Sequence, residues 1–152
     1  MSRIVSLIAS STEIVCALGF GEQLVGRSHE CDYPEWVRRL PVCTAPKFAV
    51  DGTSYEIDQW VKAILAEGLS VYRVDAELLR ELRPDLIVTQ SQCDVCAVSL
   101  RDLEQAVCGC IDSRPRIVSL EPNALDDVWR DIRAVAAALG ASERGEKLVA
   151  EL

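Results

Sequence analysis

Residues 90–99, QSQCDVCAVS, form the stretch of this chain best suited to chemistry, because two thiols follow a run typical of a buried β-strand. Cys93 and Cys96 stand at C-x-x-C spacing. Such a pair can be a thiol redox centre, half of a metal site or the wall of a ligand crevice, and it can equally be two small residues that pack well. Their neighbours along the chain and in the predicted fold decide between these interpretations.

The redox and zinc interpretations each meet an objection. Asp94 lies between the two thiols, and its negative charge opposes formation of the thiolate that attacks in redox chemistry. A four-cysteine zinc site would also need Cys108 and Cys110. The helix predicted over 99–107 would carry those two residues about 13 Å away, at ~1.5 Å per residue, toward the opposite end of the sheet.

A mixed metal site stays open. His29 is the only histidine of the chain, and with Cys31, Cys93 and Cys96 it offers imidazole and thiolate ligands that suit zinc or iron. A single histidine after a strand is as often a hydrogen-bonded structural residue as a ligand. The sequence therefore predicts these four residues as candidate metal ligands and leaves both roles of the histidine open.

Length and composition predict one soluble globular domain, since the chain has 152 residues, of which 49% are hydrophobic and 26% charged. A net charge of −8 without a basic run predicts that it binds neither nucleic acid nor an anionic membrane surface. No stretch approaches the ~20 apolar residues of a membrane span, so we expect no direct membrane insertion. The opening MSRIVSLIAS lacks the features of a secretory signal, which predicts a cytoplasmic protein, or a periplasmic or extracellular one if the natural N-terminus was removed.

The sequence gives little support for an enzyme. It contains no G-x-x-x-x-G-K-[ST] or G-x-G-x-x-G phosphate loop and no G-x-S-x-G nucleophile elbow. Any Ser-His-Asp or Cys-His catalyst would depend on His29, and no residue stands out as the group that would orient it. We therefore expect a binding protein.

Short apolar, β-branched runs alternate with segments of helical period. This alternation predicts an α/β domain with an open, doubly wound, mostly parallel sheet and helices on both faces. Ser10 and Glu13 match a capping box for the first helix, Asp75 matches an N-cap, and 30–53 reads as a long irregular connection. The predicted strands are 3–8, 23–28, 85–90 and 116–121, with 69–74 as a fifth strand or the approach to one. The predicted helices are 10–18, 54–68, 75–82, 99–107, 124–140 and 142–152.

The loops that leave the carboxyl ends of parallel strands meet at one edge of such a sheet, and ligands bind there. The loops after the four strands read ASSTE, HECDYP, SQCDVC and EPNA. The conspicuous polar and sulfur side chains are concentrated in these loops. The candidate ligand-binding residues are Ser11, Thr12, His29, Glu30, Cys31, Asp32, Tyr33, Gln90, Cys93, Cys96 and Glu121.

Three segments resemble the amino-terminal lobe of the solute-binding proteins of cobalamin and iron-chelate ABC importers. They are RIVSLIASSTEIVCALGFGEQLVGRSHECDYP at 3–34, LRPDLIVTQ at 82–90 and SLEPNALDDVWRDIRAVAAALG at 119–140. The similarity is greatest to cobalamin-binding members, and the chain resembles a variant of them without a signal. Relative to shorter members of that family, residues 41–74 form an insert.

This resemblance implies one lobe of a two-lobed protein bridged by a long helix, with a chelate held in the cleft between the lobes. Residues 1–140 would be the solute-binding lobe, and 141–152 the start of the bridging helix or a terminal helix. Cys93 and Cys96 would belong to the ligand wall. The expected ligand is cobalamin or another metal chelate, bound without catalysis, and the expected partner is an importer membrane subunit or a second copy. The alternative is a metal-binding or thiol-redox protein that uses Cys93 and Cys96.

Overall fold

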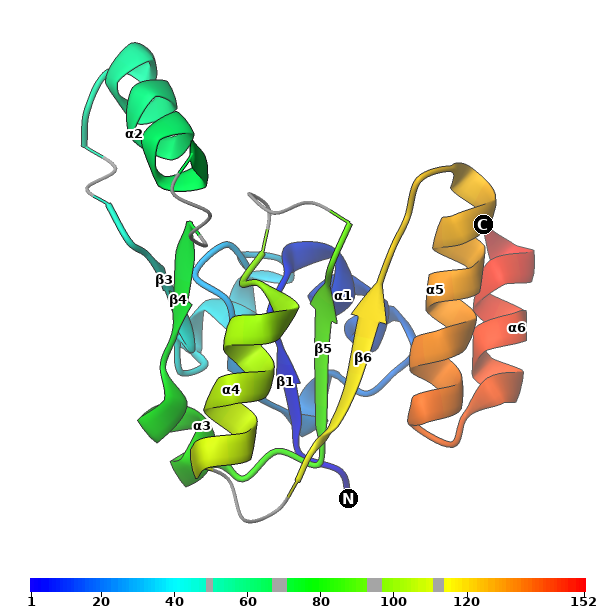
Figure 1. The fold of residues 1–152 in the computed structure, drawn as a ribbon. Helices are drawn as coiled ribbons and strands as arrows, with labels where there is room; N and C mark the ends of the chain where they lie inside the picture. Colours follow the sequence, from blue (N-terminus) through cyan, green and yellow to red (C-terminus); the bar gives the residue numbers. More distant parts are fainter. Residues whose placement is uncertain (49–50, 67–70, 93–96, 111–113) are drawn as a thin grey trace.

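A computed structural model of the chain describes residues 1–48, 51–66, 71–92, 97–110 and 114–152. Its centre is a sheet of four parallel strands in the order β2-β1-β5-β6 (Figure 1). Each strand coincides with one of the four predicted runs, and the parallel sheet confirms the predicted fold class. The strands are β1 (Ile4–Ser6), β2 (Leu24–Arg27), β5 (Leu86–Gln90) and β6 (Arg116–Leu120).

Helices alternate with the strands, as predicted, in the described part of the chain. Asp75 caps its helix, since its carboxylate accepts a hydrogen bond of 2.9 Å from the Leu78 N–H. Ser99 does the same one helix later, with its hydroxyl 3.1 Å from the Asp102 nitrogen. The helices are α1 (Ala9–Ala17), α2 (Ser54–Ala66), α3 (Ala76–Leu82), α4 (Leu100–Cys110), α5 (Leu125–Ala138) and α6 (Ser142–Glu151).

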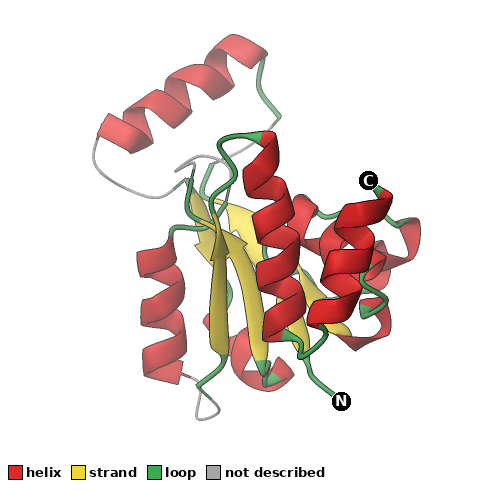
Figure 2. Ribbon diagram, turned by 90° about the vertical axis from the view of Figure 1, so that its right-hand side faces the viewer, coloured by secondary structure: helices red, strands yellow, loops and turns green. Residues whose placement is uncertain are grey.

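Both faces of the sheet are covered by helices (Figure 2). On one face, Ile4 of β1 belongs to a core with Ile132 of α5. On the other face, Val5 and Ile87 belong to a core with Leu103 of α4. Because side chains alternate along a strand and both faces are buried, the strands read as unbroken apolar runs.

The first helix is capped differently from the sequence prediction. The prediction of a capping box formed by Ser10 and Glu13 is wrong, because α1 begins at Ala9 and no side chain caps its first turn. The Ser11 hydroxyl instead lies 3.0 Å from the carbonyl oxygen of Ile8. The hydroxyls of Ser11 and Thr12 face inward to partners in the fold, which a pattern of local spacing does not reveal.

A second, two-stranded antiparallel sheet pairs β3 (Thr44–Pro46) with β4 (Tyr72–Val74). The fifth predicted run thus forms a strand, but it lies outside the main sheet. β3 falls within the connection predicted as irregular, together with a short 3₁₀-helix, Glu35–Arg39. A strand of three residues that ends in proline carries too little periodicity to be predicted.

Helix α2 stands apart from these layers. It lies beyond the carboxyl edge of the main sheet, and both views place it there (Figures 1 and 2). None of its residues is buried. Among the described residues, no helix has the length and apolar character needed to cross a membrane.

Helix α6 lies alongside α5, as both views show (Figures 1 and 2). The helix predicted over 142–152 therefore forms, while its role as a bridge to a second lobe stays a prediction. Gly145 is buried at the contact, and a Cβ placed there would lie 2.7 Å from the Cβ of Ala136. No other atom of the described residues would come closer than 3.6 Å, so this one contact sets how closely the helices approach.

Gly145→Ala should destabilise the fold by about 1–3 kcal/mol, even though alanine favours a helix more than glycine does, because the added methyl overlaps Ala136. Urea unfolding followed by circular dichroism would measure the change. The double variant Gly145→Ala/Ala136→Gly removes the overlap and should recover part of the loss. With Ala136→Gly measured as well, a loss in the double variant equal to the sum of the two single losses would show that the two positions are not coupled.

Candidate functional site

The carboxyl ends of the four parallel strands point to one edge of the sheet, which is uppermost in Figure 1. The described candidate residues follow those ends, and they divide into a buried set and a more exposed set. The buried residues are Ser11, Thr12, Cys31 and Gln90. The more exposed residues are His29, Glu30, Asp32, Tyr33 and Glu121.

The buried set forms a network of hydroxyls and one thiol under the edge. The Ser6 hydroxyl, at the end of β1, lies 2.6 Å from that of Ser11 and 2.7 Å from that of Thr12. Thr12 also lies 3.1 Å from the Cys31 sulfur. These groups satisfy one another within the protein, so they hold the loops after β1 and β2 together instead of facing solvent.

Cys31 is a structural thiol in this arrangement. Its side chain is 1% exposed, and its sulfur contacts Thr12 and the carbonyl oxygen of Ser6. Burial raises the pKa of the Cys31 thiol, and the hydrogen bond with Thr12 offsets part of that shift. A thiol held protonated in this way is a poor nucleophile and a weaker metal ligand than a thiolate.

His29 lies at the end of β2 with both ring nitrogens close to a partner. Nδ1 is 2.7 Å from the Thr44 hydroxyl, and Nε2 is 3.3 Å from a carboxylate oxygen of Glu30. The imidazole also packs against the Tyr72 ring, with 4.9 Å between ring centroids. Thr44 and Tyr72 belong to the small sheet, so β3 and β4 orient the histidine, and Glu30 lies beside its Nε2.

Burial lowers the pKa of His29 below its ordinary value of 6.5. The carboxylate of Glu30 acts in the opposite direction, and the positive charge of Arg27 adds to the lowering. The imidazole is therefore neutral near pH 7. Neutral imidazole is the form that coordinates a metal.

A second polar cluster lies at the ends of β5 and β6. The Ser91 hydroxyl donates to a Glu121 carboxylate oxygen at 2.7 Å, and Ser119 lies 2.7 Å from Ser91. The Gln90 amide lies 3.2 Å from that of Gln92. Asp131, which looks from the sequence like an exposed helix residue, is buried near this cluster, and burial raises its pKa.

The cations close to the edge are already engaged. Arg27 donates to the carbonyl oxygens of Ser28 at 2.9 Å and Cys31 at 3.1 Å. Arg38 pairs with Asp32 at 3.4 Å. The exposed Glu30 and Glu121 add two carboxylates to this edge, where the positive charge of Arg27 also acts on His29.

The predicted mixed metal site is only partly within the described residues. Cys93 and Cys96 lie outside them, so their part in the site stays a prediction. Among the residues that are described, no group of three or more His, Cys, Asp and Glu side chains could hold a metal ion. His29 and Cys31 also bond to different partners, Thr44 and Thr12 respectively.

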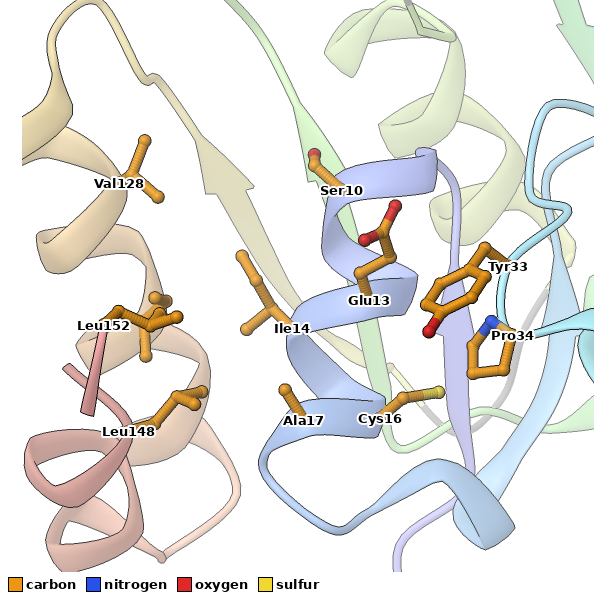
Figure 3. A pocket seen from close by; sticks show the side chains of 11 residues that line it. Ser10, Glu13, Ile14, Cys16, Ala17, Tyr33, Pro34, Val128, Leu148 and Leu152 are labelled. Carbon is orange, nitrogen blue, oxygen red and sulfur yellow. The ribbon is translucent and has the colours of Figure 1, made fainter.

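An apolar groove of about 590 Å³ runs beside α1 (Figure 3). Ile14 and Ala17 of α1 line one side, and Leu148 and Leu152 line the other, at the end of the chain. Tyr33 is the single predicted site residue in its described lining. The sequence did not indicate this groove, because its walls come from segments more than a hundred residues apart.

These features define the chain as an α/β lobe whose polar loop residues gather at the carboxyl edge of a parallel sheet. The periplasmic binding protein family matches residues 4–152, and the chain belongs to that family. The predicted resemblance is thereby confirmed. The family is one of binding proteins, in agreement with the expectation of a non-enzymatic role.

Two solved structures have the same fold, and one further relative is similar in sequence. The periplasmic heme-binding protein RhuT from Roseiflexus sp. RS-1 is 30% identical, with a TM-score of 0.66, 98% of this chain covered and 45% of that one. The periplasmic vitamin B12 binding protein BtuF of Vibrio cholerae is 21% identical, with a TM-score of 0.61, 99% of this chain covered and 46% of that one. An uncharacterised ABC transporter substrate-binding lipoprotein of Bacillus subtilis, YvrC, is 24% identical over 148 residues, 97% of this chain and 37% of the relative.

The chain thus spans less than half the length of each of these relatives. Their descriptions as periplasmic proteins or as a lipoprotein give no support to the predicted cytoplasmic location, which stays a prediction.

Thr12→Val should cost about 1–2 kcal/mol of stability, because it keeps the shape of the side chain but removes the hydroxyl that bonds to Ser6 and Cys31. Urea unfolding would measure the loss. Ser10→Ala, an exposed change on the same helix, should stay within about 0.5 kcal/mol. A loss as large for Ser10 as for Thr12 would restore the capping role that the structure contradicts.

The single imidazole should titrate below pH 6.5, which proton NMR can follow without ambiguity because His29 is the only histidine. Since its pKa is lower in the folded state, the unfolded chain binds the proton more tightly. The contribution of His29 to stability is therefore complete above about pH 6.5 and is lost as the pH falls through the folded pKa. His29→Gln should show a smaller fall of melting temperature across that range, and an NMR midpoint at or above pH 6.5 would contradict the lowered pKa.

Proposed function

We propose that the protein binds a corrinoid, or a closely related metal chelate, at the carboxyl edge of the sheet, as a solute-binding protein. The observation that carries this proposal is His29, a neutral imidazole held by Thr44 and Tyr72 at that edge. Cobalt accepts imidazole and thiolate as axial ligands. Family membership and the names of RhuT and BtuF support a macrocyclic metal chelate as the ligand class.

The hydrogen-bond acceptors of the edge favour a corrinoid over heme. Heme carries two propionate carboxylates, whereas the rim of a corrin carries amides, whose N–H groups donate hydrogen bonds to carboxylates. Glu30 and Glu121 offer carboxylates, while Arg27 and Arg38 are already engaged. A rim of amides would donate hydrogen bonds to these carboxylates, whereas ionised propionates could not.

The candidate residues take two roles under this proposal. The exposed set, with Cys93 and Cys96, contacts the chelate, and His29 stands nearest the metal. Ser11, Thr12 and Cys31 hold the loops beneath it. A single lobe covers one side of a chelate, so affinity for this chain alone should be modest, because good pockets enclose most of their ligand.

An importer membrane subunit is the proposed partner, because a relative is described as an ABC transporter substrate-binding lipoprotein. The predicted helix 141–152 would then continue as the bridge to a second lobe. The alternative, a metal-binding or thiol-redox role for Cys93 and Cys96, predicts bound zinc or iron in the untreated protein.

Titration with hydroxocobalamin, followed by visible absorption, should give a saturable spectral shift for the reduced protein. His29→Gln should weaken binding about tenfold or more and reduce the shift, because an axial imidazole is lost. Hemin titrated in parallel should bind more weakly than the corrinoid, because its propionates cannot donate hydrogen bonds to Glu30 and Glu121.

Glu143→Gln is the matched control, since it changes one exposed carboxylate in the first turn of α6, away from the carboxyl edge of the sheet, and should leave binding unaltered. Metal analysis of the untreated sample accompanies the titration. Stoichiometric zinc or iron, without any shift on addition of the corrinoid, would support the cysteine-centred alternative and refute the corrinoid proposal.

A further inference from the structure

Helix α2 presents an apolar face that the described structure covers only in part, through the contact of Phe48 with Trp60. Ile57, Val61 and Ile64 are half-buried on this face, while Trp60 is 39% and Leu65 37% exposed. The spacing of these residues is that of an amphipathic helix. Helices of this kind normally bury such a face against a neighbour.

Local interactions alone hold α2 together. Thr53 and Glu56 form a reciprocal cap: the Thr53 N–H lies 2.8 Å from the Glu56 carboxylate, and the Glu56 N–H lies 3.3 Å from the Thr53 hydroxyl. Asp58 and Lys62 add an ion pair one turn apart. A helix of 13 residues is only marginally stable in water when such local interactions support it. A partner that buries the apolar face would therefore supply most of the stability of the helix.

The segment around α2 is rich in aromatic side chains. The chain has three Trp, three Tyr and two Phe, and four of these eight fall within 48–72. The Phe48 and Trp60 rings lie 6.4 Å apart between centroids. Tyr72 already packs on His29. Aromatic rings suit the flat, conjugated face of a macrocyclic ligand.

From these contacts we infer that the apolar face of α2, with Phe48, covers one face of the chelate bound beside His29. The inference rests on the proposed function. The helix lies beyond the same sheet edge as the candidate site (Figures 1 and 2), and Tyr72, which contacts the imidazole, belongs to β4, the strand that follows α2 in the chain. The insert would then supply part of the enclosure that a bare sheet edge lacks.

A second copy of the chain is a poorer occupant of this face. At 13 residues and ~1.5 Å per residue, α2 is about 20 Å long, and a stripe half a helix diameter wide offers on the order of 100 Å². Stable protein interfaces bury about 800 Å² on each partner. A single macrocycle needs far less contact area than a protein partner does.

Hydrogen exchange of the α2 amides, read by mass spectrometry with and without hydroxocobalamin, tests the inference beside the absorption titration. The free helix should exchange rapidly because none of its residues is buried, and the bound helix should exchange at least tenfold more slowly. Trp60→Ala should weaken binding about tenfold. Gln59→Ala, on the exposed face of the same helix, is the control and should bind like the unaltered chain.

The outcomes separate this inference from the proposed function. A saturable shift without protection of α2, and with an affinity of Trp60→Ala equal to that of the unaltered chain, would refute the inference that α2 covers the chelate. Chelate binding itself would stand. No saturable shift would refute both. Protection of α2 before any chelate is added, together with a dimer in sedimentation, would assign the face to a second copy and refute the cover as well.

Discussion

The enclosure of β1 is the constraint on which the rest of the structure depends. Ile4, Val5 and Ser6 are fully buried, so every backbone N–H and C=O of that strand must find a partner inside the fold. Parallel pairing with β2 and β5 provides those partners and aligns the three strands in one direction. The loops after the strands must therefore emerge at one edge. The position of the candidate site is therefore a consequence of how the buried strand β1 satisfies its backbone hydrogen bonds.

The same constraint explains why the candidate residues serve two purposes. Ser6 ends β1 with its hydroxyl buried, and an unpaired buried hydroxyl would be costly. Ser11 and Thr12 turn inward to pair with it, and Thr12 reaches Cys31 on the next loop. The hydrogen bonds of these groups are therefore made to one another, and they join two loops. What remains for a ligand is the outer rim, where His29 and the acidic side chains lie.

The long segment between β2 and α3 gives this rim its character. β3 brings Thr44 to one nitrogen of His29, and β4 brings Tyr72 against the ring, so the small sheet fixes an imidazole that would otherwise rotate. Residues next to β3 also bond to the outer edge of β2, with the Cys43 N–H 2.8 Å from the Arg27 carbonyl oxygen. An edge that would otherwise invite pairing with another chain is thereby occupied. The insert both protects the sheet and orients its single histidine.

The amino-acid sequence alone specified most of the elements and their order. The apolar runs around Ile4 and Ile87 and the helix stops at Gly19 and Gly140 depend on local periodicity and turn geometry, and both glycines have positive φ. Which polar residues are buried was settled by the packing of the whole chain: Thr12 and Glu13 are adjacent, yet the first points into the Ser6 network and the second lines the groove beside α1. The same packing places β3 and β4 outside the main sheet, where Thr44 and Tyr72 contact His29. Those outcomes depend on contacts between residues far apart in the chain, which spacing within one segment does not encode.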